Sequence, residues 1–387
     1  MAGAGPVGLT AALALRRRGV AVTVLERGAG LATASRASTF HSPSLALLDE
    51  LGVLAEVRPR GHPVTAIGYY TVAGGPLASF PLRLLASHTP YPLRLHVEQS
   101  IVAAALARRL DGCIRFHAEV VAVAPDEAGV AVTVRSAGGA ERTERGSFLV
   151  AADGARSAVR AASSIAFEGE EYPHRVLRVM TQDDLGALIP GLASISYIFD
   201  EAGSCSLLRM PDVWRVIFRI PAGESDAEAL DEARIRERLR RFLPRGGEAV
   251  AIASTDIYRV GRRVAARYRA GRVLIAGDAA HITNTRGGMN MNCGLQDAVS
   301  AAEAIALACE DPPDGEAALA RYACERRRVA TEMLLPRTDR TVTGGAAWLE
   351  TIRTAAADPA SAERFLLGSS MLDMSGPRFP ARAKAAA

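Results

Sequence analysis

A glycine-rich turn at the start of the chain constrains its fold more than any other sequence feature. Residues 3–8 read Gly-Ala-Gly-Pro-Val-Gly, a G-x-G-x-x-G pattern, and the alanine- and leucine-rich residues 9–18 predict a helix ended by Gly19. The β-branched run 20–25 predicts a strand that ends at Glu26. Such glycines permit a tight turn and close approach of the backbone to a pyrophosphate, and an acid after the next strand can bind a ribose diol. The pattern therefore predicts half of a dinucleotide-binding domain.

One element of that unit is missing from the sequence. A buried strand of about five residues should precede the glycine turn, yet only Met1 and Ala2 stand before Gly3. This strand is central in such folds, and its absence would leave backbone groups of its neighbours unpaired. We therefore expect the sequence to be truncated at its start, and a chain extended upstream to bind cofactor better or to be more stable.

Composition excludes several classes of protein. The chain has 387 residues, of which 49% are apolar and 23% charged, as in a globular protein with a large core. The 46 basic residues nearly balance the 42 acidic ones, which argues against a nucleic-acid partner. No apolar run is long enough to span a membrane, and no export signal is present. Five scattered cysteines and seven histidines show no metal-ligand spacing, so we predict a cytoplasmic protein without a metal.

Secondary-structure patterns along the chain alternate between two kinds. Helical and buried-strand patterns near the ends are separated by strand-rich stretches in the middle. The strand-rich stretches are a hairpin at 64–85, a meander at 114–152, strands within 176–220 and a strand at 249–260. The other predicted elements are a helix after Ser42, helices at 98–110 and 225–243, a buried strand at 273–276 and further helices after it.

Two further motifs lie far from the glycine turn. A strand at 149–152 runs into Asp153-Gly154 and a helix, and the strand at 273–276 runs into Gly277-Asp278, followed by the glycine- and asparagine-rich loop 287–292. In this order and spacing, the three motifs resemble the class A FAD-dependent aromatic hydroxylases, flavoprotein monooxygenases of the para-hydroxybenzoate hydroxylase fold. The resemblance covers nearly the whole chain. Weaker similarity to the family occurs at 167–169 and in the Y-x-x-E-R-R run 322–327.

The resemblance implies an α/β fold. It consists of a Rossmann-like FAD-binding domain of the three-layer ββα type, an inserted substrate domain with a mixed β-sheet, and C-terminal helices. We predict that the FAD-binding domain comprises residues 1–63, 93–165 and 262–387, and that the β-rich substrate domain comprises residues 64–92 and 166–261.

The resemblance also implies site residues. In it, Glu26 holds the adenosine ribose, Asp278 binds the ribityl chain, and the helix expected to begin near Gly294 points its N-terminus at the flavin. The expected cofactor-binding residues are Gly3, Gly5, Pro6, Val7, Gly8, Glu26, Arg27, Arg36, Gln99, Asp153, Gly154, Asp278, Gly287, Gly288, Met291 and Asn292. For Arg36 the alternative is a solvated loop arginine.

Substrate contacts are expected from the β-rich domain. We predict Tyr197 and Arg209 as substrate-binding residues, with a sheet-packing tyrosine and a surface arginine as the alternatives. No catalytic side chain is predicted, because the cofactor carries the difficult step. We expect His281 to be a structural hydrogen-bonding residue. The sequence departs from the family pattern at Asn290, where relatives commonly carry glycine.

The function implied by the resemblance is a FAD-dependent monooxygenase. It would consume NADPH or NADH and O2 and hydroxylate a phenolic or polyketide-type aromatic molecule through a flavin C4a-hydroperoxide. The single G-x-G-x-x-G pattern indicates that the nicotinamide donor visits rather than stays bound. Two alternatives remain: a flavin-dependent dehydrogenase or reductase on a polyprenyl or polyketide skeleton, and a non-catalytic FAD-binding sensor. The substrate, the preferred donor and a homodimeric state are left open.

Overall fold

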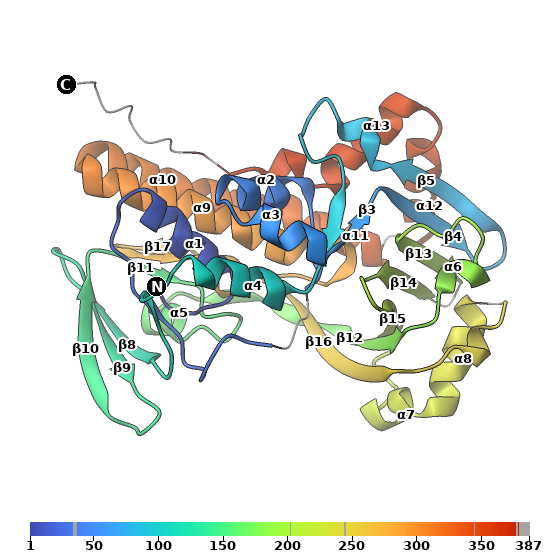
Figure 1. The fold of residues 1–387 in the computed structure, drawn as a ribbon, viewed down its shortest axis with the longest axis horizontal. Coiled ribbons are helices and arrows are strands. Elements are labelled where there is room, and N and C mark those ends of the chain that lie inside the picture. Colours follow the sequence, from blue (N-terminus) through green and yellow to red (C-terminus); the bar gives the residue numbers. More distant parts are fainter. Residues whose placement is uncertain (34–36, 202, 244, 344, 377, 379–387) are drawn as a thin grey trace.

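The structure of this chain is a computed structural model that describes residues 1–33, 37–201, 203–243, 245–343, 345–376 and 378. Figure 1 shows a helix-rich region on the left and a region built around a large β-sheet on the right. The chain passes between the two regions several times. The predicted α/β class with helices at the C-terminal end is confirmed.

Short strands form the central sheet of the helix-rich region. In spatial order they are β7 (Ile114–Arg115), β1 (Val24–Leu25), β11 (Leu149–Ala151), β18 (Val273–Ile275) and β17 (Arg269–Ala270). Ala2 lies between β1 and β11 and makes parallel bridges to Leu25 and Ala151. The residues before the glycine turn therefore occupy the place of the expected central strand. The upstream segment stays a prediction.

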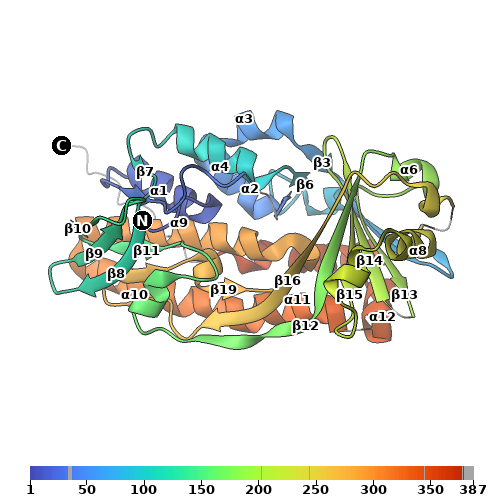
Figure 2. The same cartoon turned by 90° about the horizontal axis from the view of Figure 1, so that it is seen from below.

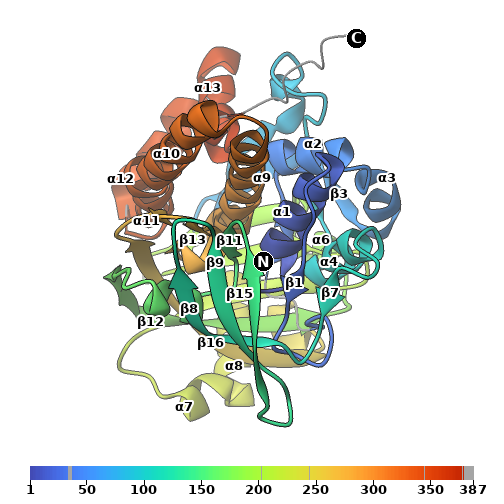
Figure 3. The same ribbon diagram turned by 90° about the vertical axis from the view of Figure 1, so that its left-hand side faces the viewer.

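Helices cover one face of this sheet and a three-stranded meander covers the other (Figure 3). The helices are α1 (Pro6–Arg17), α2 (Ser42–Glu50), α3 (Leu54–Val57), α4 (Gln99–Arg108), α9 (Met289–Glu310) and α10 (Pro312–Arg328), and α5 (Ala158–Ala162) packs on the meander. The meander consists of β8 (Glu119–Pro125), β9 (Val130–Arg135) and β10 (Glu141–Gly146). One hydrophobic core joins all three layers, since Leu9, Val132 and Leu274 belong to the same buried cluster.

The second region is an eight-stranded mixed sheet. Its order is β19 (His281–Ile282), β16 (Ser254–Ala265), β12 (Phe167–Thr181), β15 (Trp214–Ile220), β14 (Gly203–Arg209), β13 (Ile195–Asp200), β4 (Ala66–Thr71) and β5 (Gly75–Pro81). All pairs are antiparallel except β13 with β4. The predicted hairpin at 64–85 therefore exists, as β4 and β5. A small sheet of β2 (Thr39–Phe40), β6 (Arg94–His96) and β3 (His62–Val64) accompanies it.

Helices pack on the large sheet with two separate cores. One core combines strand residues such as Phe218 with α8 (Glu232–Phe242). The other combines Tyr69 and Phe80 with α12 (Gly345–Ala355) and α13 (Pro359–Ser369). The short helices α6 (Leu185–Leu188) and α7 (Asp226–Leu230) lie beside the sheet, and a π-helical segment, Val329–Leu334, joins α10 to α11 (Leu335–Thr343).

Two features differ from the predicted elements. The charged helix expected over 225–243 is broken at Asp231, whose extended backbone and side chain cap α8. The helices α12 and α13 pack on the eight-stranded sheet, although they fall in the segment assigned to the FAD-binding domain. The exact domain boundaries stay a prediction.

The long strands β12 and β16 connect the two regions. They pair from Phe167 opposite Ala265 to Met180 opposite Ser254, with one irregularity between Glu171 and Arg175. Figure 2 shows this ribbon running lengthwise along the molecule. Because it spans both regions, it holds the face of the large sheet against the ends of the central strands. None of the helices in the described ranges combines the length and apolar character that a membrane crossing requires.

Candidate functional site

A cavity of about 430 Å³ lies where the two regions meet. On the side of the helix-rich region, the predicted site residues that line it are Gly5, Pro6, Val7, Gln99, Gly154, Asp278, Gly287, Gly288 and Met291. On the opposite side, the face of the large sheet lines it, including the predicted Tyr197. The tertiary structure thus brings together residues from all three motifs and from the substrate region.

The glycine turn leaves the N-terminus of α1 open toward this cavity. Gly5 is the N-cap residue, no side chain caps the helix, and no acidic residue stands in its first turn. A Cβ atom on Gly3 would overlap the carbonyl oxygen of Ala152, whereas one on Gly5 would meet nothing within 4 Å. Gly3 is therefore required by packing, and Gly5 borders open space. Free N–H groups at a helix N-terminus fit a pyrophosphate.

Glu26 organises the backbone around the glycine turn. Its Oε2 accepts a hydrogen bond from the Ala4 N–H at 2.7 Å, and its Oε1 accepts one from the Gly28 N–H at 2.8 Å. Glu26 also lines a second hollow of about 60 Å³. The predicted residues Gly3, Arg27 and Asp153 line the same hollow. Each carboxylate oxygen can accept a further bond, so the arrangement fits a ribose diol.

The Asp153-Gly154 turn has one unsatisfied polar atom. Asp153 Oδ2 accepts a hydrogen bond from the Val159 N–H at 3.2 Å, whereas its buried Oδ1 has no partner among the described residues. A buried acceptor without a donor is unfavourable, so this oxygen fits a ligand hydroxyl. Arg160 holds the turn in place: it donates to the carbonyl oxygens of Ala155 and Ala279, both at 2.9 Å.

A second helix N-terminus also faces the cavity. The helix α9 begins at Met289, not near Gly294 as predicted, because Gly287 and Gly288 adopt positive φ angles that turn the chain directly into it. Gly294 lies one turn inside the helix, where a Cβ atom would stand 2.9 Å from the Cα atom of Gly277. No side chain caps α9 either.

Two predicted cofactor residues within the described ranges, Gly8 and Asn292, do not line the main cavity or the hollow. Gly8 packs against the carbonyl of Gly3, where a Cβ atom would overlap. Asn292 is buried and holds the loop: its Oδ1 accepts from the His41 N–H at 2.9 Å, and its Nδ2 donates to the Thr39 carbonyl at 2.7 Å. These two residues position the loops around the cavity. Arg36 lies outside the described residues.

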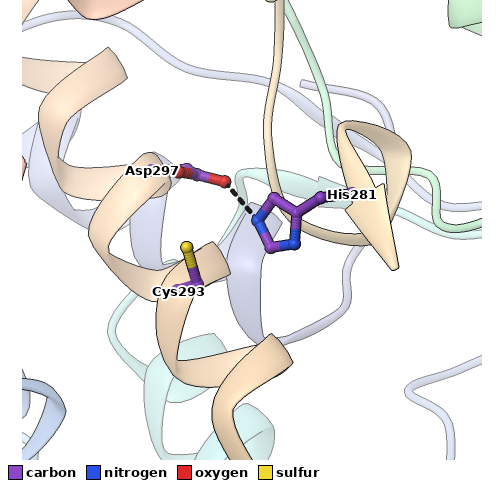
Figure 4. Close-up of side chains that lie close together, drawn as sticks. All are labelled: His281, Cys293 and Asp297. Atoms are coloured by element: carbon purple, nitrogen blue, oxygen red, sulfur yellow. Dashed lines mark hydrogen bonds and ion pairs between the residues drawn. The ribbon is translucent and has the colours of Figure 1, made fainter. Parts of the chain in front are cut away.

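A buried charge network joins α9 to β19, and Figure 4 shows three of its side chains, His281, Cys293 and Asp297. Asp297 on α9 accepts from Arg326 Nε at 2.6 Å and from the Gly277 N–H at 3.1 Å, and its Oδ2 lies 2.9 Å from His281 Nε2. Burial lowers the pKa of His281, but the neighbouring Cys293 and Asp297 outweigh it and raise that pKa well above its usual value.

This network extends to the cavity wall through Asn290. The Oδ1 atom of Asn290 lies 2.9 Å from His281 Nδ1, and its Nδ2 donates to Asp278 Oδ1 at 2.8 Å. Asp278 lines the cavity, so a chain of contacts links it to Arg326. The expected structural role of His281 agrees with these contacts.

The donor atoms of His281, Cys293 and Asp297 lie within 4.8 Å of one another, a spacing that could hold a metal ion. However, the Arg326 guanidinium already donates to Asp297 and to Cys293 Sγ, the latter at 3.0 Å. A second cation next to this guanidinium would be repelled. The arrangement therefore fits a salt-bridge network rather than a metal centre.

The Y-x-x-E-R-R run has a structural explanation. Tyr322 on α10 donates to the carbonyl oxygen of Ile275, at the end of β18, at 2.6 Å. Arg326, one turn later, reaches Asp297 and the carbonyl of Met374. Both residues therefore support the strand end and α9 from behind, and neither lines the cavity.

The structure separates the two predicted substrate residues. Tyr197 is buried and lines the cavity, but Arg209 does not line it. Residues alternate between the faces of a strand, and Ser206 and Leu208 are the β14 residues on the cavity side, so Arg209 lies on the other face. Arg209 instead pairs with Asp184 at 3.0 Å on the surface.

Sequence reasoning missed several arginines of the cavity. On β15, Arg215, Ile217 and Arg219 line it, while the alternate residues Trp214, Val216 and Phe218 belong to a buried core. The alternation of arginine and apolar residues is visible in the sequence, and it could have identified Arg215 and Arg219 as residues on one face of the strand. Arg178 on β12 and Arg286 in the loop before α9 also line the cavity.

Comparison with known proteins identifies similar chains. The family described as FAD binding domain matches residues 1–335. Para-nitrophenol 4-monooxygenase of Pseudomonas sp. (strain WBC-3) is 32% identical over 356 residues, which cover 90% of this chain and 86% of that protein. 6-Methylpretetramide 4-monooxygenase of Streptomyces rimosus is 33% identical over 350 residues, 86% of this chain and 60% of that protein.

A solved structure gives a similar result. The crystal structure of p-nitrophenol 4-monooxygenase from Pseudomonas putida DLL-E4 matches with a TM-score of 0.87 at 28% identity, covering 97% of this chain and 98% of that one. Residues 1–335, which the family model matches, include the glycine turn, the Asp-Gly turn and α9.

Proposed function

Since this chain belongs to the FAD binding domain family and is a flavoprotein monooxygenase, we propose that it hydroxylates a single-ring phenol, with NADPH or NADH as electron donor. The observation that carries this proposal is a cavity that joins two open helix N-termini to the face of a β-sheet. Such a cavity can place a flavin at one end and an aromatic substrate at the other.

The helix-rich region would hold the cofactor. Gly5 and the N-terminus of α1 would bind the pyrophosphate, Glu26 the adenosine ribose, and Asp278 the ribityl chain. The N-terminus of α9 would lie at the flavin ring, where its partial positive charge stabilises negative charge on the reduced ring. Bound FAD would supply the redox chemistry, accepting a hydride from the donor and reacting with O2.

The large sheet would orient the substrate and exclude water. Val176, Ile195 and Ile217 present apolar side chains to the cavity, and Tyr197 adds an aromatic ring. An apolar enclosure keeps water away from the reacting atoms and holds the ring carbon close to the cofactor. No side chain of this chain has to act as a nucleophile.

The size of the cavity favours a single-ring phenol over a polyketide. The cavity of about 430 Å³ would have to accommodate both the flavin ring and the substrate. A small substrate fits this space better than a tetracyclic one.

The test is anaerobic reduction of the holoenzyme by NADPH or by NADH, with and without members of a phenol panel, followed by admission of O2. We expect a phenol to accelerate flavin reduction and to gain one oxygen atom, labelled when ¹⁸O2 is used. Substrate oxidation without oxygen incorporation would contradict the proposal and would identify a dehydrogenase. Flavin binding without any substrate-stimulated donor oxidation would instead identify a sensor.

A further inference from the structure

The residues that follow α13 form a strap against α9, which consists of residues 370–376 and 378. At one end, the buried Arg326 joins the strap to α9: it donates to the carbonyl oxygen of Met374 at 2.9 Å and to Asp297 at 2.6 Å. At the other end, Arg378 Nε donates to Glu303 Oε1 at 2.9 Å. The strap is therefore attached to the helix whose N-terminus faces the cavity.

A methionine-rich core fixes the first of these ends. Met371 and Met374 are buried in one cluster with residues of α9 and of the π-helical segment; the other buried members are Met289, Cys293, Val329 and Leu334. Met371 has a φ of +62°, which is uncommon for a residue other than glycine and persists only where the surrounding contacts fix it. Met289 lines the cavity, so one core joins the strap to the cavity wall.

Ion pairs fix the other end. Glu303 is buried and also pairs with Arg18, the C-cap residue of α1, at 2.9 Å. Arg378 Nη2 donates to Glu50, the last residue of α2, at 2.8 Å. A buried carboxylate needs cationic partners, and here one partner comes from α1 and the other from the strap. The strap thus links α9 to α2 and, through Glu303, to α1.

The strap and the cofactor would act on the same helix from different sides. FAD would bind at the N-terminus of α9, whereas the strap holds that helix through Arg326 and the methionine-rich core. Without the docked strap, Arg326 would lose the carbonyl of Met374, and Met289 would lose part of the core around it. A less ordered first turn of α9 would bind FAD less tightly. By linkage, bound FAD would favour the docked strap by the same factor.

We propose that docking of the strap and binding of FAD are coupled, so that the strap acts as a conformational device that retains the cofactor. Arg378 is a positioning residue in this device, because it does not line the cavity and acts through Glu303 and Glu50. The inference depends on FAD binding and is independent of the molecule that is hydroxylated.

The first test measures the strap in the wild-type full chain. Hydrogen–deuterium exchange is followed with and without FAD at the amides of Met371 and Met374, which donate to the carbonyls of Gly368 and Met371. We expect FAD to slow their exchange about fivefold or more, the range of coupling between two sites. The helix α8, which packs on the large sheet, should exchange at the same rate in both states. Equal exchange of the strap with and without FAD would overturn the proposal.

The second test releases the strap at its exposed end. Arg378→Gln should weaken FAD binding about fivefold or more, measured by fluorescence quenching during flavin titration, and should speed exchange of the strap in the FAD-free chain. Arg378→Lys keeps a charge and should retain part of the affinity. The matched control is Arg353→Gln on α12, which has 53% side-chain exposure against 45% for Arg378 and should change neither quantity.

A third variant displaces the strap without removing a charge. In Gly376→Ala the new Cβ atom would stand 2.7 Å from Arg326 Cδ, and Arg326 is held by Asp297, so the strap has to move. We expect weaker FAD binding and faster strap exchange here too. Faster exchange with wild-type FAD affinity, in this variant or in Arg378→Gln, would overturn the coupling. Neither measurement uses a phenol, so the coupling can fail while hydroxylation is observed, and the reverse.

Discussion

The two ends of the cavity are built in different ways. At the cofactor end, backbone groups line the wall, and glycines allow α1, α9 and two strand ends to approach closely. At the substrate end, side chains of alternate strand residues line the wall, and several of them are charged. A backbone-lined wall tolerates few substitutions, whereas a wall of side chains can change its chemistry while the sheet stays the same. The difference explains how related proteins can share a cofactor and act on different molecules.

The largest effect is expected behind the cofactor end. Arg326→Met would leave Asp297 buried with a lost partner, and breaking a buried ion pair costs about 3–5 kcal/mol. We expect this decrease in the free energy of unfolding, measured by denaturant titration, together with loss of bound FAD. Arg328→Met, two residues away with pairs to Glu325 and Glu332 at the surface, is the control and should change stability by less than about 1 kcal/mol. If Arg326→Met changed the free energy of unfolding by less than about 1 kcal/mol and kept FAD, the buried network would not stabilise the cofactor end of the cavity.

A single methyl group should also damage the cofactor end. Gly3→Ala places a Cβ atom against the carbonyl of Ala152 at a φ of +97°, so we expect a loss of about 2–3 kcal/mol of stability and of most bound flavin. Gly19→Ala has a similar positive φ of +77° but open space around the new atom. Gly19→Ala should lower the free energy of unfolding by about 1 kcal/mol and leave flavin binding unchanged. Equal flavin absorbance in the two variants would refute the packing argument.

A smaller effect is expected where the network reaches the cavity. Asn290→Gly restores the residue common in the family and removes the bonds to Asp278 and His281. We expect the binding free energy of FAD to become less favourable by about 1 kcal/mol, which weakens FAD binding about fivefold. Fluorescence quenching during flavin titration measures this affinity. Unchanged affinity would mean that Asp278 is positioned without Asn290.

The smallest effect is expected at Arg209. Its partner Asp184 is exposed and the pair lies outside the cavity, so Arg209→Gln should change stability by less than about 0.5 kcal/mol and leave substrate affinity unchanged. A clear loss of substrate affinity, measured by calorimetry, would contradict the placement of Arg209 outside the cavity.

Sequence reasoning succeeded unevenly across these regions. The glycine turn, the Asp153-Gly154 turn and the Gly277-Asp278 strand end were recognisable because each depends on neighbours in the chain. The start of α9 was missed because Gly287 and Gly288 look like loop residues, yet their positive φ angles form the entry to the helix. Of the two residues predicted to bind substrate, Tyr197 lines the cavity and Arg209 does not, since a shift of one residue reverses the face of a strand. Their role in substrate binding stays a prediction.

The sequence by itself determined the fold class, the three motifs and the family, because turns, strand ends and helix starts follow from local backbone preferences. Only the tertiary structure decided which side chains meet. Asp297, His281 and Arg326 are joined across α9, β19 and α10, and Arg219 and Arg286 share Ser204 across separate elements. Such contacts depend on strand register and helix packing, which bring together residues that no local pattern relates.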